Sequence, residues 1–134
     1  MSRAGFALRV ALLPVAVLAG VWLHGQSAIV AMTLMPVPDT GPLSIAVKIS
    51  QGFLAATLNA ALACYPLARL YGRVASGVAT LIVLSVLAGA LQAGSGATTD
   101  AALLLQVWSM ACFAALLFGG IWLARRRQAG DSAR

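Results

Sequence analysis

The stretch from Pro42 to Tyr71 most constrains the fold, because it is long, apolar and almost free of charge. Small side chains recur in it at every fourth position, namely Gly52, Ala56, Ala60, Cys64 and Ala68. At about 100° per residue, this spacing gathers the small residues toward one side of a helix. A small face opposite a leucine-bearing face is typical of membrane helices, because small residues let backbones approach closely and bulky residues meet lipid. The stretch therefore predicts the central helix of a membrane bundle.

The composition supports a membrane protein. Of the 134 residues, 61% are hydrophobic and only 9% are charged. A water-soluble chain of this length cannot bury so much apolar surface, whereas lipid accommodates it. The length allows about four spans of ~20 residues each. The net charge of +6 comes from basic residues at the ends of apolar segments, which indicates membrane topology and argues against nucleic acid as a partner.

Turn-forming residues divide the chain. Three prolines and a glycine between positions 36 and 42 separate the first two apolar segments. We predict one transmembrane domain, 1–127, with helices at about 6–35, 42–71, 74–93 and 101–124, followed by a short polar cytoplasmic tail at 128–134. The apolar run Val10–Leu23 also resembles a signal-peptide core, but the cleavage pattern at 26–28 is incomplete. We therefore expect the first helix to be retained.

The basic residues predict the orientation. In a four-span arrangement, seven arginines fall on one side: Arg3, Arg9, Arg69, Arg73, Arg125, Arg126 and Arg127. The other side holds Lys48 together with Asp39 and Asp100. Because basic residues concentrate in cytoplasmic loops, both termini are predicted to be cytoplasmic. The expected fold class is an all-α, integral membrane four-helix bundle made of two antiparallel hairpins, multi-pass in the cell inner membrane.

Polar side chains gather at the predicted outer membrane boundary, about 20 residues from the arginines. This candidate outer polar cluster contains His24, Gln26, Lys48, Gln51, Gln92 and Gln106. One interpretation is that the cluster only marks the headgroup region, where polar groups cost little and Lys48 snorkels outward. The other is a polar vestibule that binds a head group or a small solute. His24 is the only histidine, and it has no partners at metal-ligand spacing.

A second group of residues is predicted to pack helices together. Asn59 falls near the bilayer midplane, where its amide needs a hydrogen-bond partner, and Ser85 lies at a similar depth. The expected packing residues are Gly52, Ala56, Asn59, Ala60, Ala63, Ser85, Ala115 and Gly119. We expect the small face of 42–71 to contact the protein's own first and third helices.

Catalytic signatures are missing from the sequence. There is no GxSxG, HExxH or Walker pattern, the two cysteines form no CxxC pair, and no acidic residue lies within a predicted span. We expect no enzyme, no cofactor and no metal site. The leading hypothesis is an accessory or stabilising subunit of a larger membrane complex, whose partners are the lipid bilayer and another membrane protein or a second copy. The alternative is a small oligomeric transporter or channel for a neutral or anionic solute or lipid.

Overall fold

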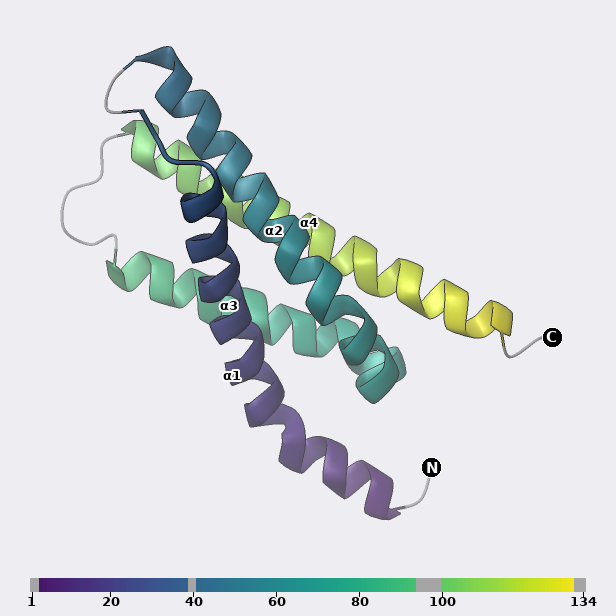
Figure 1. The fold of residues 1–134 in the computed structure, drawn as a ribbon. Helices are drawn as coiled ribbons and strands as arrows, with labels where there is room; N and C mark the ends of the chain where they lie inside the picture. Colours follow the sequence, from purple (N-terminus) through teal and green to yellow (C-terminus); the bar gives the residue numbers. More distant parts are fainter. Residues whose placement is uncertain (1–2, 39–40, 94–99, 132–134) are drawn as a thin grey trace.

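The computed structural model describes residues 3–38, 41–93 and 100–131. It contains the helices α1 (Arg3–Leu34), α2 (Pro42–Tyr71), α3 (Ala75–Ala93) and α4 (Asp100–Asp131), with a short 3₁₀ helix, η1 (Gly72–Val74), between α2 and α3. The described chain is 96% helical, which confirms the all-α class. Figure 1 shows the helices crossing one another, with the start of α1 and the end of α4 on the side where α2 turns into α3.

Three helical stretches, rather than the four predicted, are long and apolar enough to cross a membrane. They are Gly5–Leu34, Pro42–Gln92 and Asp100–Gly130. The number of stretches is three because α2, η1 and α3 follow one another without a non-helical residue and therefore form one continuous helical stretch. The chain nevertheless changes direction at Gly72, whose φ of 52° and ψ of −115° lie in a region that favours glycine.

The fourth helix is longer than predicted. It runs past position 124 to Asp131, so the segment expected to be a polar tail is helical through that residue, and 132–134 lie outside the described residues. Arginine and glutamine are good helix formers, so the arginine tract of α4 continues the helix. Charge predicts where a helix leaves the membrane, but it does not end the helix.

The most extensive helix pair is α2 with α4. The two helices run parallel, because residues early in α2 contact residues early in α4 and later residues contact later ones. Trp108 Nε1–H donates to the Ile49 carbonyl at 3.2 Å, and further along the Cys64 thiol donates to the Leu117 carbonyl at 3.5 Å. The expectation that the small face of α2 packs on the first and third helices is therefore wrong for its main partner, which is α4.

The first helix packs antiparallel to α2 and also contacts α3. Near the end of α1, the Gln51 side-chain amide donates to the Met35 carbonyl. At the middle of α1, a Cβ placed on Gly20 would lie 2.6 Å from Ile82 Cδ1. The absence of a side chain at Gly20 permits this close approach. The contact of α3 with α1 is more extensive than its contact with α2.

The interior is thin and apolar, and much of the surface is apolar as well. The largest fully buried side chains are Phe113, Ile82, Leu117, Ile121 and Asn59. Large hydrophobic side chains on every α-helix remain exposed, among them Leu18, Leu62, Leu91 and Leu104 at more than 60%. A lipid environment would cover such a surface, because lipid solvates leucine at no cost.

The charged residues lie at the two ends of the molecule. Arg69 lies in the last turn of α2 and Arg73 in η1, while Arg9 and Arg73 line the same hollow. Arg125, Arg126 and Arg127 lie near the end of α4, which runs parallel to α2. We call this side the arginine end. Lys48 and Asp100, by contrast, lie near the opposite end, at the start of α2 and α4.

Candidate functional site

The six residues of the candidate outer polar cluster are distributed over several surroundings. Gln26, Lys48 and Gln92 are exposed. Gln51 donates a hydrogen bond to the Met35 carbonyl, and Gln106 lines an otherwise apolar hollow between α3 and α4. The six residues therefore do not line one common cavity of the described structure, as the vestibule interpretation requires. The position of a residue along a helix predicts its depth, but not the direction in which its side chain points.

His24 lies between helices rather than at an open surface. Its ring centre is 4.4 Å from that of Phe113 on α4, with an angle of 49° between the two planes. Its Nδ1 is buried and has no hydrogen-bond partner within the described structure. Three His, Cys, Asp or Glu side chains that together could hold a metal ion were not found among the described residues. His24 thus forms part of the α1–α4 contact.

Asn59 is 1% exposed, and its Nδ2 also has no partner among the described residues. The prediction that Ser85 supplies this partner is wrong. Ser85 is exposed, and its hydroxyl donates to the Leu81 carbonyl of its own helix at 2.8 Å. An equal depth in the membrane did not place the two residues on facing surfaces.

The other predicted packing residues of α2 lie toward the interior. Ala56, Ala60 and Ala63 are buried, and Gly52 approaches α4 so closely that an added Cβ would lie 3.3 Å from Ser109 Cβ. On this helix the stripe of small residues therefore faces protein.

On α4 the small row faces outward instead. Ala115 and Gly119 are exposed, and a Cβ on Gly119 would meet nothing within 4 Å. The close contact is made by Gly120, whose added Cβ would overlap the Cys64 sulfur. Successive residues of a helix differ by about 100°, so only the rotation of α4 decides which of two adjacent glycines faces α2. The sequence pattern therefore predicted the correct turn of α4, but it predicted Gly119 as the packing residue where the structure has Gly120.

A groove lies between α2 and α4 toward the arginine end, with a volume of about 630 Å³. We call it the α2–α4 groove. Half of its lining consists of small residues: Ala60, Ala61, Cys64, Gly119, Gly120 and Ala124. Exposed Tyr65 and Leu123 also line it, together with Arg127 near the end of α4. The lining is mainly apolar and holds no carboxylate.

Exposed small residues along a groove are the kind of surface on which two membrane helices pack, because they let a second backbone approach closely. Ala111, Ala115 and Gly119 are all exposed on α4 at intervals of four residues, but only Gly119 lines the α2–α4 groove, whereas Ala111 lines the hollow between α3 and α4. No protein-family model, curated protein or solved structure matches the chain. The small residues of the α2–α4 groove are therefore the feature from which a function can be argued.

Proposed function

We propose that the protein is a non-catalytic accessory subunit of the cell inner membrane, which holds a transmembrane helix of a larger membrane protein in the α2–α4 groove. In this proposal the chain spans the bilayer four times as two antiparallel hairpins, with both termini cytoplasmic. The observation that carries it is the small-residue lining of the groove, in which Ala61 and Gly119 are exposed and an added Cβ on Gly119 would meet nothing within 4 Å.

Length supports four spans. The helical stretch Pro42–Gln92 has 51 residues. At about 1.5 Å per residue it would measure roughly 75 Å, more than twice a hydrocarbon core of about 30 Å. The change of direction at Gly72 divides this stretch into α2 and α3, each long enough for one crossing.

Charge and aromatic residues support the orientation. The arginine end carries the basic residues, as cytoplasmic ends do. At the same end, Arg126 Cζ lies 3.8 Å from the centre of the exposed Trp122 ring. A tryptophan stacked under a cation at the end of a span is typical of the membrane–water interface, where both groups remain partly hydrated.

The proposal is tested by closing the groove without disturbing the fold. Gly119→Leu places a large side chain in the groove, whereas Gly89→Leu on α3 changes an equally open glycine elsewhere. Purification of the wild-type protein in mild detergent should recover a larger membrane protein, which Gly119→Leu loses and Gly89→Leu retains. A wild-type protein that always migrates alone, or an intact complex with Gly119→Leu, would overturn the proposal. Cross-links from the groove only to a second copy would replace the larger partner by a homodimer.

A second candidate function is a small oligomeric transporter or channel for a neutral or anionic solute or lipid. The observation that favours it is a pair of buried nitrogen atoms, His24 Nδ1 and Asn59 Nδ2, that have no hydrogen-bond partner among the described residues, because unpaired polar groups inside a membrane protein are often functional. Flux into proteoliposomes should then fall in Asn59→Leu and in Lys48→Ala. Unchanged flux in both variants would exclude Asn59 and Lys48 from the transport pathway.

A further inference from the structure

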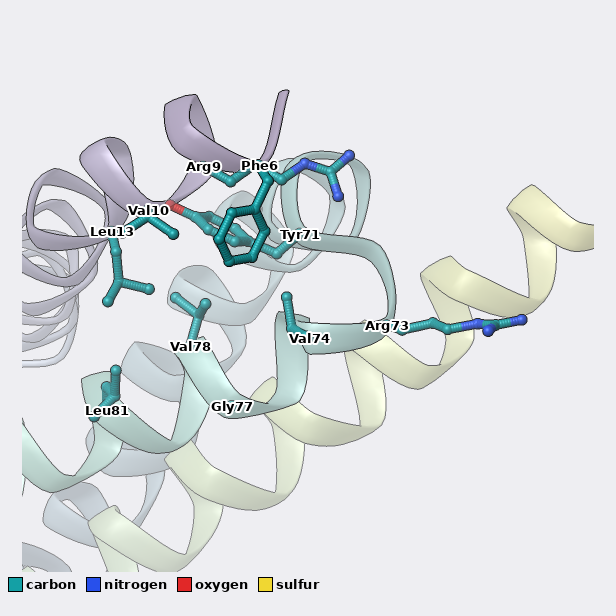
Figure 2. Close-up of a pocket in the computed structure, with 10 residues that line it drawn as sticks. All are labelled: Phe6, Arg9, Val10, Leu13, Tyr71, Arg73, Val74, Gly77, Val78 and Leu81. Carbon is teal, nitrogen blue, oxygen red and sulfur yellow. The ribbon is translucent and has the colours of Figure 1, made fainter. Parts of the chain in front are cut away.

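A second groove opens at the arginine end, and no residue of α4 lines it. It lies between the first half of α1, Tyr71, η1 and the start of α3, and its volume is about 630 Å³. Figure 2 shows the side chains that line it. We call it the α1–α3 groove. It shares no lining residue with the α2–α4 groove, so the two surfaces can be occupied independently.

The walls of the α1–α3 groove are apolar. Phe6, Val10 and Leu13 come from α1, and Val74, Val78 and Leu81 come from η1 and α3. Phe6 and Val74 are each at least 60% exposed, so the walls are open to the surroundings. Gly77 leaves space between them, because a Cβ on it would meet nothing within 4 Å. An apolar groove of this kind, open along its length, suits a hydrocarbon chain.

Two cations stand at the mouth of the groove. Arg9 and Arg73 are lining residues that come from different elements, and no carboxylate is among the lining residues. Figure 2 shows both guanidinium groups extending to the side of η1, with that of Arg73 directed outward from the apolar walls. Both side chains are long and flexible, and guanidinium groups bind phosphate oxygens through paired, charge-assisted hydrogen bonds.

A hydroxyl group without a partner lies in the same lining. Tyr71 is 3% exposed, and its Oη is buried with no hydrogen-bond partner in the part of the chain that the structure describes. A buried hydroxyl in a membrane protein is costly unless an acceptor reaches it. In Figure 2 the Tyr71 oxygen points toward Val10 of α1, on the side away from the Arg9 guanidinium.

We propose that the α1–α3 groove is a binding site for an anionic phospholipid of the cytoplasmic leaflet. One acyl chain lies along the apolar walls beside Gly77, and the phosphate is bound by the side chains of Arg9 and Arg73. The charge of the mouth favours an anionic over a zwitterionic head group. This site rests on the proposed membrane orientation, but it does not depend on a helix in the α2–α4 groove.

The test measures which lipid the protein retains. Purified protein is incubated in mixed micelles that contain phosphatidylglycerol and phosphatidylcholine with identical acyl chains, and bound lipid is counted by native mass spectrometry. We expect about a tenfold preference for phosphatidylglycerol, or about 1.4 kcal/mol, because the cationic choline of phosphatidylcholine is repelled by the two arginines whereas the neutral glycerol is not. The preference should be lost in the double variant Arg9→Gln/Arg73→Gln. Equal retention of the two lipids by the wild-type protein would overturn the proposal.

Two controls separate a site from a general effect of charge. Arg69→Gln/Arg125→Gln removes the same charge from the same end, outside the lining residues, and should leave the preference unchanged. Gly77→Leu fills the groove at constant charge and should lower lipid retention severalfold. Loss of preference in both arginine pairs, or full retention by Gly77→Leu, would overturn the site. Recovery of the larger partner protein is expected to be unchanged in all three variants, so the outcome is distinct from that of the Gly119→Leu experiment.

Discussion

The contact between α2 and α4 differs sharply from that between α2 and α3. The first pair is separated by the whole of α3 in sequence and yet forms the most extensive contact, whereas the second pair is joined directly through η1 and contacts little. The α2–α4 contact is built where small residues meet, as at Gly120 with Cys64 and at Gly52 with Ser109. The α2–α3 pair is joined at the turn around Gly72, and its direct contact is small.

The difference shows what selects partners when lipid surrounds the helices. Lipid removes the general advantage of burying leucine, so van der Waals packing between closely approaching backbones decides which helices associate. Four substitutions test this comparison, each measured as the free energy of unfolding by SDS titration in mixed micelles.

The largest effect is expected for Gly120→Leu. The new side chain would overlap Cys64 and force α2 and α4 apart, at a cost of about 3 kcal/mol from overpacking. Gly119→Leu, one residue earlier and in open space, is the matched control and should unfold like the wild-type protein. Equal destabilisation by the two substitutions would contradict the rotation of α4 described above.

The α2–α3 pair should be most sensitive at its turn. Gly72→Ala forces a side chain into a backbone conformation with φ of 52° and ψ of −115°, which costs about 2 kcal/mol. Gly77→Ala, in the helix that follows, has ordinary helical surroundings and open space, and should be neutral or slightly stabilising. If Gly72→Ala were as stable as Gly77→Ala, the turn would not limit this pair.

A smaller effect is expected where α3 meets α1. Gly20→Ala brings a methyl group against buried Ile82, which is 1% exposed and has little room to move. Relative to Gly25→Ala, a change in open space on the same helix, we expect a loss of about 1.5 kcal/mol. Adding Ile82→Ala to Gly20→Ala should remove most of the steric part, as a double-mutant cycle would show. Additive losses would refute the contact.

The smallest effect is expected at Gln51. Gln51→Leu removes the hydrogen bond to the Met35 carbonyl, and polar contacts between membrane helices contribute only about 0.6 kcal/mol on average. Ser50→Ala serves as control, because the Ser50 hydroxyl donates within its own helix, to the Ala46 carbonyl. A loss above that of Gly20→Ala would mean that polar contacts, rather than close approach, select the partners.

Much of the fold could be predicted from the sequence, whereas most of the candidate site could not. The second helix has the predicted bounds, because Pro42 begins it and Gly72 ends it. The turn of α4 that approaches α2 was also identified by its small residues, but the choice between Gly119 and Gly120 was not. That choice depends on a rotation of about 100°, which no local pattern specifies.

Both grooves combine side chains from helices that are distant in sequence. Neither Arg9 nor Tyr71 indicates a binding site in the sequence. Arg9 indicates only membrane topology, and Tyr71 only marks the end of a predicted helix. Their shared groove arises because the start of α1 lies beside η1 and α3. The α1–α3 groove is therefore defined only by how the helices pack.

The sequence by itself determined the apolar helices, the turns that separate them and the collection of arginines at segment ends, because these depend on composition and on local backbone preferences. Only the tertiary structure decided that α2 packs parallel to α4, that Ser85 turns away from Asn59, and that Gly119 remains open while Gly120 is closed. Those outcomes depend on how whole helices rotate and cross. Each is selected by the fit of many small contacts over the length of a helix, and no single residue specifies it.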